Sequence, residues 1–220
     1  MLQDTGYCPI AYTEKSTYSS IAHALHSITP YGWSECSFSY TDKKDKKAQK
    51  SDEDSSTNDS QEKKDKARFV DFWCMDSKKE FELWIEAKRI WLNIGTNTKK
   101  EFTERVKSRI KETIKQIRII KEAKPYQDAK EANLKIALFT INASCATTQI
   151  PSDKDIDSIP KILNDLLANF IDNRSNMGVL LGVCDMDPKV TNNECAKEAG
   201  NVYNNDTYTP YLAIGAIVLE

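Results

Sequence analysis

Two β-rich runs that follow each other closely constrain the fold of this chain most. They are residues 67–76 (ARFVDFWCMD) and residues 80–95 (EFELWIEAKRIWLNIG), and only the polar stretch SKK separates them. Together they predict a β-hairpin. Because a strand points alternate side chains to one face, Glu86 and Lys88 of the second run project together, although the surrounding segment is strongly apolar.

The hairpin predicts which residues face each other. With the turn centred between residues 78 and 79, the numbers of paired residues sum to 157, which places Asp71 directly opposite Glu86. The same register pairs Trp73 of the first run with Trp84 of the second. Two like charges directly opposed in a sheet destabilise it unless something positive lies between them. A divalent cation such as Mg²⁺ fits, because it prefers oxygen ligands and takes only one or two protein carboxylates.

The residues alone leave a second interpretation open. Asp71, Glu86 and Lys88 could form a cross-strand salt-bridge cluster on an exposed sheet face. Trp73 and Trp84 on that same face argue against full exposure, although they could also line a groove. The sequence therefore predicts either a metal site or an ion-pair cluster at this position.

The rest of the chain alternates helical and strand patterns. Apolar periodicity predicts helices over residues 13–28, 101–124 and 159–173, and strands over residues 35–40, 134–143, 177–187 and 211–220. The resulting order is α, β, β, β, α, β, α, β, β, and the last three strands read as buried on both faces. Interleaved helices and buried strands predict an α/β fold, a three-layer α/β/α sandwich around a mixed central sheet.

Length and composition predict one domain that spans residues 1–220, since 40% hydrophobic content is enough for a real core. Residues 42–66 hold many charges and no apolar residue larger than alanine, which predicts an insertion loop without a catalytic role. No basic leader or long apolar stretch appears, so we expect a soluble, cytoplasmic protein with no membrane partner. The six cysteines form no C-x-x-C pair, which argues against a zinc ribbon or a thioredoxin-like motif.

Charge is unevenly distributed along the chain. The net charge of -2 argues against a uniformly basic nucleic-acid coat. Residues 99–124 nevertheless hold ten Lys or Arg against four Asp or Glu. Solvation of an outer helix face and contact with phosphates explain these charges equally well. If phosphates are bound, Lys99, Lys100 and Arg105 are the candidates, because they follow the strand that carries Glu86.

The arrangement of a strand with Asp, a turn, a strand with E-x-K, a helix and another strand resembles the core of the PD-(D/E)XK nuclease superfamily. The matching residues are Asp71 in FVDFW and Glu86, Ala87 and Lys88 in WIEAK, and the resemblance covers residues 13–143. It implies a restriction-endonuclease-like core and a Mg²⁺-dependent phosphodiesterase in which Mn²⁺ can substitute. The resemblance gives Asp71, Glu86 and often the Ala87 carbonyl as metal ligands, and Lys88 as the group that orients or helps to deprotonate the attacking water. A bound cation suits this reaction, because it lowers the pKa of the water and polarises the phosphoryl oxygen.

Further residues follow from the same resemblance. Family members often carry an acidic residue on the first helix or at the first strand; Glu14 and Glu35 both qualify, and we favour Glu35 as the catalytic one. Some branches carry a glutamine and a tyrosine four residues apart on the helix after the motif; here Gln116 is followed by Ile120, and Gln116 joins the candidates for nucleic-acid binding. The D-x-D at residues 185–187 could be a second metal site, but a turn at the next residue explains it better.

Two functions of different classes are compatible with these features. One is a metal-dependent DNA endonuclease, and the other is a catalytically inactive protein of the same fold that binds nucleic acid or protein. A homodimer is compatible with the first, because cutting both strands of a duplex needs two sites.

Overall fold

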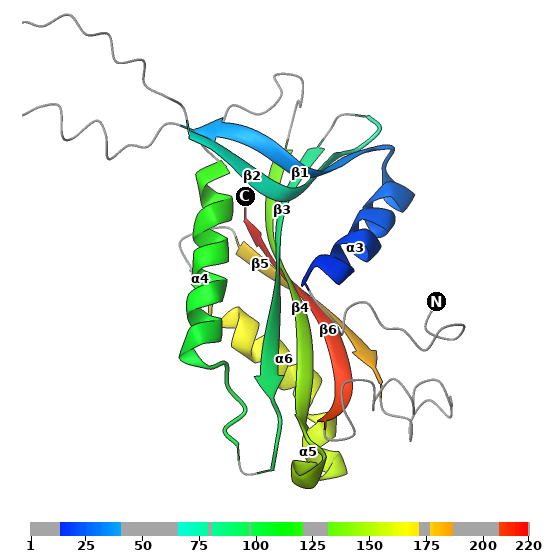
Figure 1. Ribbon diagram of the computed structural model, residues 1–220, viewed down its shortest axis with the longest axis vertical. Helices are drawn as coiled ribbons and strands as arrows, with labels where there is room; N and C mark the ends of the chain where they lie inside the picture. Colours follow the sequence, from blue (N-terminus) through cyan, green and yellow to red (C-terminus); the bar gives the residue numbers. More distant parts are fainter. Residues whose placement is uncertain are drawn as a thin grey trace, which may run out of the picture.

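A computed structural model describes residues 14–40, 66–78, 81–96, 98–120, 132–171, 177–186 and 207–219. Within these ranges the chain is mixed α/β, with a six-stranded sheet in the order β1-β2-β3-β4-β6-β5 and helices packed on it (Figure 1). The elements are, in chain order, α3 (Glu14–Ile28), β1 (Tyr31–Tyr40), β2 (Lys66–Met75), β3 (Phe81–Asn93), α4 (Glu104–Ile119), β4 (Ala132–Ala146), a 3₁₀ turn (Thr147–Gln149), α5 (Asp153–Asp157), α6 (Ile159–Ala168), β5 (Met177–Asp185) and β6 (Thr207–Leu219). The predicted order of helices and strands is confirmed, with the 3₁₀ turn and α5 added before α6.

The sheet is mixed because of a single parallel pair. Strands β1, β2 and β3 form an antiparallel meander, whereas β3 pairs in parallel with β4 over the full length of β3. Parallel neighbours need a crossover connection, and α4 provides it. Strand β6 lies between β4 and β5 and runs antiparallel to both.

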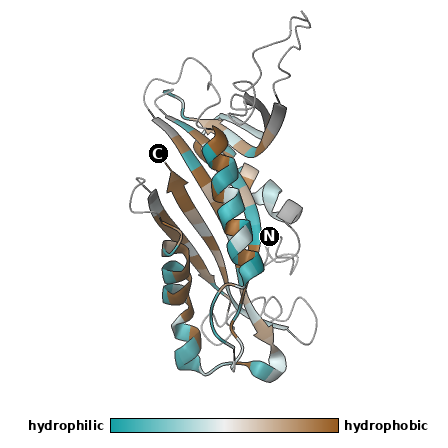
Figure 2. Ribbon diagram, turned by 90° about the vertical axis from the view of Figure 1, so that its left-hand side faces the viewer, coloured by the Kyte–Doolittle hydropathy of each residue, from teal (hydrophilic) through white to brown (hydrophobic). Residues whose placement is uncertain are grey.

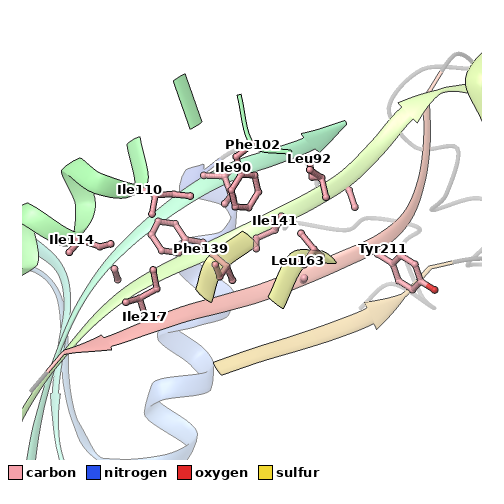
Figure 3. Packing of buried hydrophobic residues seen from close by; sticks show 14 of the residues in the cluster. Ile90, Leu92, Phe102, Ile110, Ile114, Phe139, Ile141, Leu163, Tyr211 and Ile217 are labelled. Atoms are coloured by element: carbon pink, nitrogen blue, oxygen red, sulfur yellow. The ribbon is translucent and has the colours of Figure 1, made fainter. Parts of the chain in front are cut away.

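The main core lies between the sheet and the helices α4 and α6. Helix α4 begins after Thr103, whose side chain accepts a hydrogen bond from the backbone N–H of Val106, and it packs on β3 and β4. Its outward surface is hydrophilic, and the strands below it are hydrophobic (Figure 2). Figure 3 shows the buried side chains of α4, β3, β4, α6 and β6 that meet in this core, among them Ile110, Ile90, Phe139, Leu163 and Ile217.

Helix α3 packs on the other face of the sheet, against β1 and β3. A second cluster of buried side chains, Phe72, Ile85 and Ala87, lies beneath it. The ring of Tyr18 on α3 meets Phe72 edge-on, with 5.1 Å between ring centroids. Phe72 and Trp73 therefore point to opposite faces of β2, as neighbouring strand residues do.

Strand β5 differs from its prediction. We expected it to be buried on both faces, but Gly178, Leu180, Gly182 and Cys184 are exposed, with Leu180 65% exposed. The reason is its place at the edge of the sheet, where α6 covers only one face. A continuous apolar run does not reveal which of its faces another element covers.

Some predictions fall outside the described residues. Apart from Lys66, which begins β2, the predicted insertion at residues 42–66 lies there. The last residues of the predicted helix 101–124 lie there too, because the description of this segment ends at Ile120. Among the helices of the described ranges, none is both long and apolar enough to span a bilayer.

Candidate functional site

The β2–β3 register is the predicted one. Trp73 pairs with Trp84 and Phe72 pairs with Ile85, so the numbers of paired residues sum to 157. The ladder stops at the Phe72–Ile85 pair. Asp71 and Glu86 occupy the next position of the same register, where β2 begins to part from β3.

The point at which β2 parts from β3, called the fork below, coincides with a change in strand alternation. Val70 and Trp73 both pack in the core on the α4 side, whereas Phe72 packs on the α3 side. Residues two apart in a regular strand share a face, so the alternation breaks at Asp71. Beyond this residue, the ribbon of β1 and β2 turns across the end of the sheet towards the end of α4 (Figure 1).

The Asp71 side chain takes over where the backbone pairing ends. Its Oδ2 accepts a hydrogen bond of 2.7 Å from the backbone N–H of Ala87. This bond satisfies an N–H of β3 that the departing β2 backbone no longer reaches. Because the two backbones separate here, this N–H is available to the aspartate, and the hydrogen bond holds the Asp71 side chain against β3.

Lys88 brings the predicted residues together. Its Nζ donates to Glu86 Oε1 at 2.8 Å, to the Ala87 carbonyl at 3.0 Å and to Asp71 Oδ2 at 3.4 Å. Both carboxylates thus lie within 3.4 Å of one nitrogen, as the register predicted. Asp71, Glu86, Ala87 and Lys88 form one compact cluster.

The cluster is largely shielded from water. The side chains of Asp71, Glu86 and Lys88 are 17%, 12% and 18% exposed, and the neighbouring Trp73 and Trp84 are buried. The ion pairs of the second interpretation are therefore present, but they lie on a largely covered face and not on an exposed one. Burial raises the pKa of the Glu86 carboxyl; the hydrogen bond from Lys88 opposes this, and the nearby Asp71 charge adds to it.

The three acceptor oxygens suit a hard cation. Two carboxylates and one backbone carbonyl converge on a single positively charged group, the Lys88 ammonium. Mg²⁺ and Mn²⁺ prefer such oxygen ligands, and Mg²⁺ completes its shell with water. In the described ranges, no three His, Cys, Asp or Glu side chains come together in a group that could hold a metal ion. The side-chain ligands that this cluster offers are two carboxylates, from Asp71 and Glu86.

Glu35 lies in the same row of the sheet. The numbers of paired residues in β1 and β2 sum to 106, as for Ser34 with Phe72 and Cys36 with Val70, so Glu35 falls opposite Asp71. The pair itself is absent from the ladder, and Glu35 has a φ of 52°, in the left-handed region that non-glycine residues rarely adopt. Its side chain is exposed, and no hydrogen bond or ion pair to the cluster is present in the described part of the chain. The other acidic candidate, Glu14, begins α3, which packs on the opposite face of the sheet.

The predicted phosphate-binding residues lie apart from the cluster. Lys99 pairs with Glu101 at 2.8 Å and Lys100 pairs with Asp155 at 3.4 Å. Both lysines belong to the connection between β3 and α4, at the far end of β3 from the fork (Figure 1). Arg105, exposed in the first turn of α4, lies at that end as well.

The last two predicted features are Gln116 and the D-x-D at residues 185–187. Gln116 is in the second half of α4, the part that approaches the β1–β2 ribbon, and its half-buried side chain has an Oε1 without a hydrogen-bond partner. Asp185 ends β5 at the other edge of the sheet, and residue 187 lies outside the described residues. The D-x-D is therefore not part of this cluster.

Two residues near the cluster were not predicted. Glu82 is fully buried and accepts a hydrogen bond of 3.2 Å from Trp84 Nε1, and burial raises the pKa of its carboxyl. Its place could have been found, because residues 82, 84, 86 and 88 alternate onto one face. Trp33 stacks on Trp73 from β1, but the predicted first strand began only at residue 35, so the register could not be extended to it.

We compared the chain with protein-family models, with curated proteins and with solved structures, and none of these comparisons gave a match.

Proposed function

We propose that this chain is a metal-dependent nuclease that hydrolyses phosphodiester bonds in DNA, with endonucleolytic cleavage favoured. One observation carries the proposal: the Lys88 ammonium is held by Asp71 Oδ2, Glu86 Oε1 and the Ala87 carbonyl. These are the oxygens that the resemblance to the PD-(D/E)XK superfamily assigned to a metal ion. A positively charged group already sits among them, so the site is built to hold positive charge.

The arrangement of the elements supports a restriction-endonuclease-like core. The β1-β2-β3 meander leads through α4 into the parallel strand β4, and the acidic residues lie on β2 and β3 next to one another. Helix α3 on one face, with α4 and α6 on the other, supports the three-layer α/β/α sandwich. The mixed sheet alone is common to many functions, so the proposal rests on the cluster.

The residues have distinct roles in this proposal. Asp71, Glu86 and the Ala87 carbonyl would hold Mg²⁺ or Mn²⁺, which supplies a water of lowered pKa and neutralises charge on the phosphate. Once it no longer bridges the carboxylates, the Lys88 ammonium is available to orient the attacking water and to offset charge on the phosphoryl oxygens. The resemblance gives Glu35, whose position falls opposite Asp71 in the register, as the additional acidic residue of the site.

Cleavage of DNA tests this proposal. Supercoiled plasmid and single-stranded DNA are incubated with the parent protein in Mg²⁺, in Mn²⁺ and in EDTA. We expect cleavage only with metal, and we expect Glu86→Gln and Lys88→Met to abolish it. Lys161→Met serves as the matched control, because it also removes a lysine charge but lies on α6, which packs on β5 and β6 away from the cluster.

Two results would contradict the proposal. If the parent cleaves neither DNA under any condition, the alternative of a non-catalytic binding module is favoured. If Lys88→Met cleaves as fast as the parent, the activity does not come from this cluster.

A further inference from the structure

Three tryptophans form a row across three strands. The registers place Trp33 of β1 opposite Trp73 of β2, and Trp73 opposite Trp84 of β3. Trp33 stacks on Trp73 with 5.0 Å between ring centroids and 26° between ring planes, and Trp73 meets Trp84 edge-on at 6.3 Å. The row thus begins in the core and ends at the open edge of the sheet.

Exposure changes sharply along this row. Trp84 and Trp73 are 7% and 4% exposed, whereas Trp33 is 58% exposed. The buried Trp73 indole therefore supports one face of the exposed Trp33 indole. Tyr31, two residues before Trp33 on the same strand, is 41% exposed.

The tryptophan row runs beside the acidic row. Asp71 comes two residues before Trp73 on β2, and Glu86 comes two residues after Trp84 on β3. Since a strand rises about 3.3 Å per residue, Asp71 lies about 7 Å along β2 from Trp73, and Trp33 lies one strand spacing, about 5 Å, further out on β1. A nucleotide whose phosphate lies at the carboxylates would therefore bring a neighbouring base to the exposed indole.

We propose that Trp33 is a stacking site for an unpaired base, and that the substrate class is DNA with single-stranded bases next to the scissile phosphate. This inference rests on the proposed nuclease function. Base stacking on aromatic side chains is how proteins bind single strands without reading sequence. In an intact duplex each base is already covered by its stacked neighbours, so it must first be unstacked before it can meet the indole.

Binding measured without cleavage tests the inference. Fluorescence anisotropy in Ca²⁺ measures the affinity of the protein for a labelled single-stranded oligonucleotide and for the same sequence as a blunt duplex. The oligonucleotide has about 12 nucleotides, which is within the range of single-strand binding sites. The variants are Trp33→Ala, Trp33→Tyr, which keeps a stacking ring, and Trp91→Ala. Trp91 is the matched control, because it is 45% exposed on β3 but alternates onto the opposite face from Glu86 and Lys88.

We expect Trp33→Ala to weaken single-strand binding by about tenfold or more, the loss typical of one stacked base. Duplex binding should stay unchanged, Trp33→Tyr should recover most of the affinity, and Trp91→Ala should resemble the parent. Circular dichroism and thermal melts verify that each variant is folded.

Other outcomes overturn the inference and separate it from the nuclease proposal. If Trp33→Ala binds the single strand as tightly as the parent, or loses single-strand and duplex binding equally, the stacking site is wrong while metal-dependent cleavage stands. If the parent cleaves only duplex DNA, the substrate class is wrong. If the parent neither binds nor cleaves DNA, both proposals fail.

Discussion

The backbone N–H of Ala87 donates a 2.7 Å hydrogen bond to Asp71 Oδ2, so that a side chain of β2 replaces the backbone partner that β3 loses at the fork. The carboxamide oxygen of an asparagine at position 71 can accept the same hydrogen bond from the Ala87 N–H. In EDTA, we therefore expect Asp71→Asn to match the free energy of unfolding of the parent to within about 1 kcal/mol, and Asp71→Ala to lose about 1–3 kcal/mol because it leaves the N–H unsatisfied. Urea denaturation of the three proteins measures this. Equal losses in the two variants would show that the charge of Asp71, and not its hydrogen bond, stabilises the fork.

The position of Lys88 predicts competition between its ammonium and a metal ion. Without metal, Lys88→Met should destabilise the protein, since the Asp71 and Glu86 charges then face each other without a cation. Mg²⁺ should raise the melting temperature of this variant by more than that of the parent, because the ion no longer displaces an ammonium. Thermal melts in EDTA and in Mg²⁺ test this, with Lys161→Met as the control. Identical metal-induced shifts in all three proteins would contradict the competition.

Stability should depend on pH through Glu86. Burial raises the pKa of this carboxyl above its ordinary value of 4.5, so the folded state holds the proton more tightly than the unfolded state. The unfolding free energy should therefore fall as the pH rises from 4.5 through the raised value, where the folded protein must carry the buried charge. In EDTA, Glu86→Gln should make the unfolding free energy less dependent on pH in this range.

Glu82 provides the comparison for the pH experiment. Burial also raises the pKa of its carboxyl from 4.5, so Glu82→Gln should flatten the profile in the same direction. Only Glu86→Gln should also lose the stabilisation by Mg²⁺, because Glu82 is not among the oxygens around Lys88 Nζ. Denaturation profiles of both variants against pH, with and without Mg²⁺, test this. A Glu86→Gln profile parallel to that of the parent would refute the assigned cause.

The sequence predicted the centre of the fold better than its edges. The register of Asp71 and Glu86 followed from a short polar turn and from the two-residue period of strands, both of which are local. Trp33 was missed because the first strand was predicted to begin only at residue 35, whereas β1 begins at Tyr31. The exposed face of Leu180 was missed because coverage of a strand depends on where distant helices pack. Lys99 and Lys100 were chosen because they follow the strand of Glu86 in sequence, but β3 continues to Asn93, so they lie at its far end from the cluster.

Direct titration with Mn²⁺ tests the central claim, that Asp71, Glu86 and the Ala87 carbonyl form a site for a divalent cation. Isothermal calorimetry or electron paramagnetic resonance should detect one Mn²⁺ bound per chain in the parent, and this binding should be lost in the Asp71→Asn, Glu86→Gln double variant. Lys88→Met should keep the site and bind Mn²⁺ more tightly than the parent. A parent that binds no Mn²⁺, or a double variant that binds it as tightly as the parent, would contradict the account.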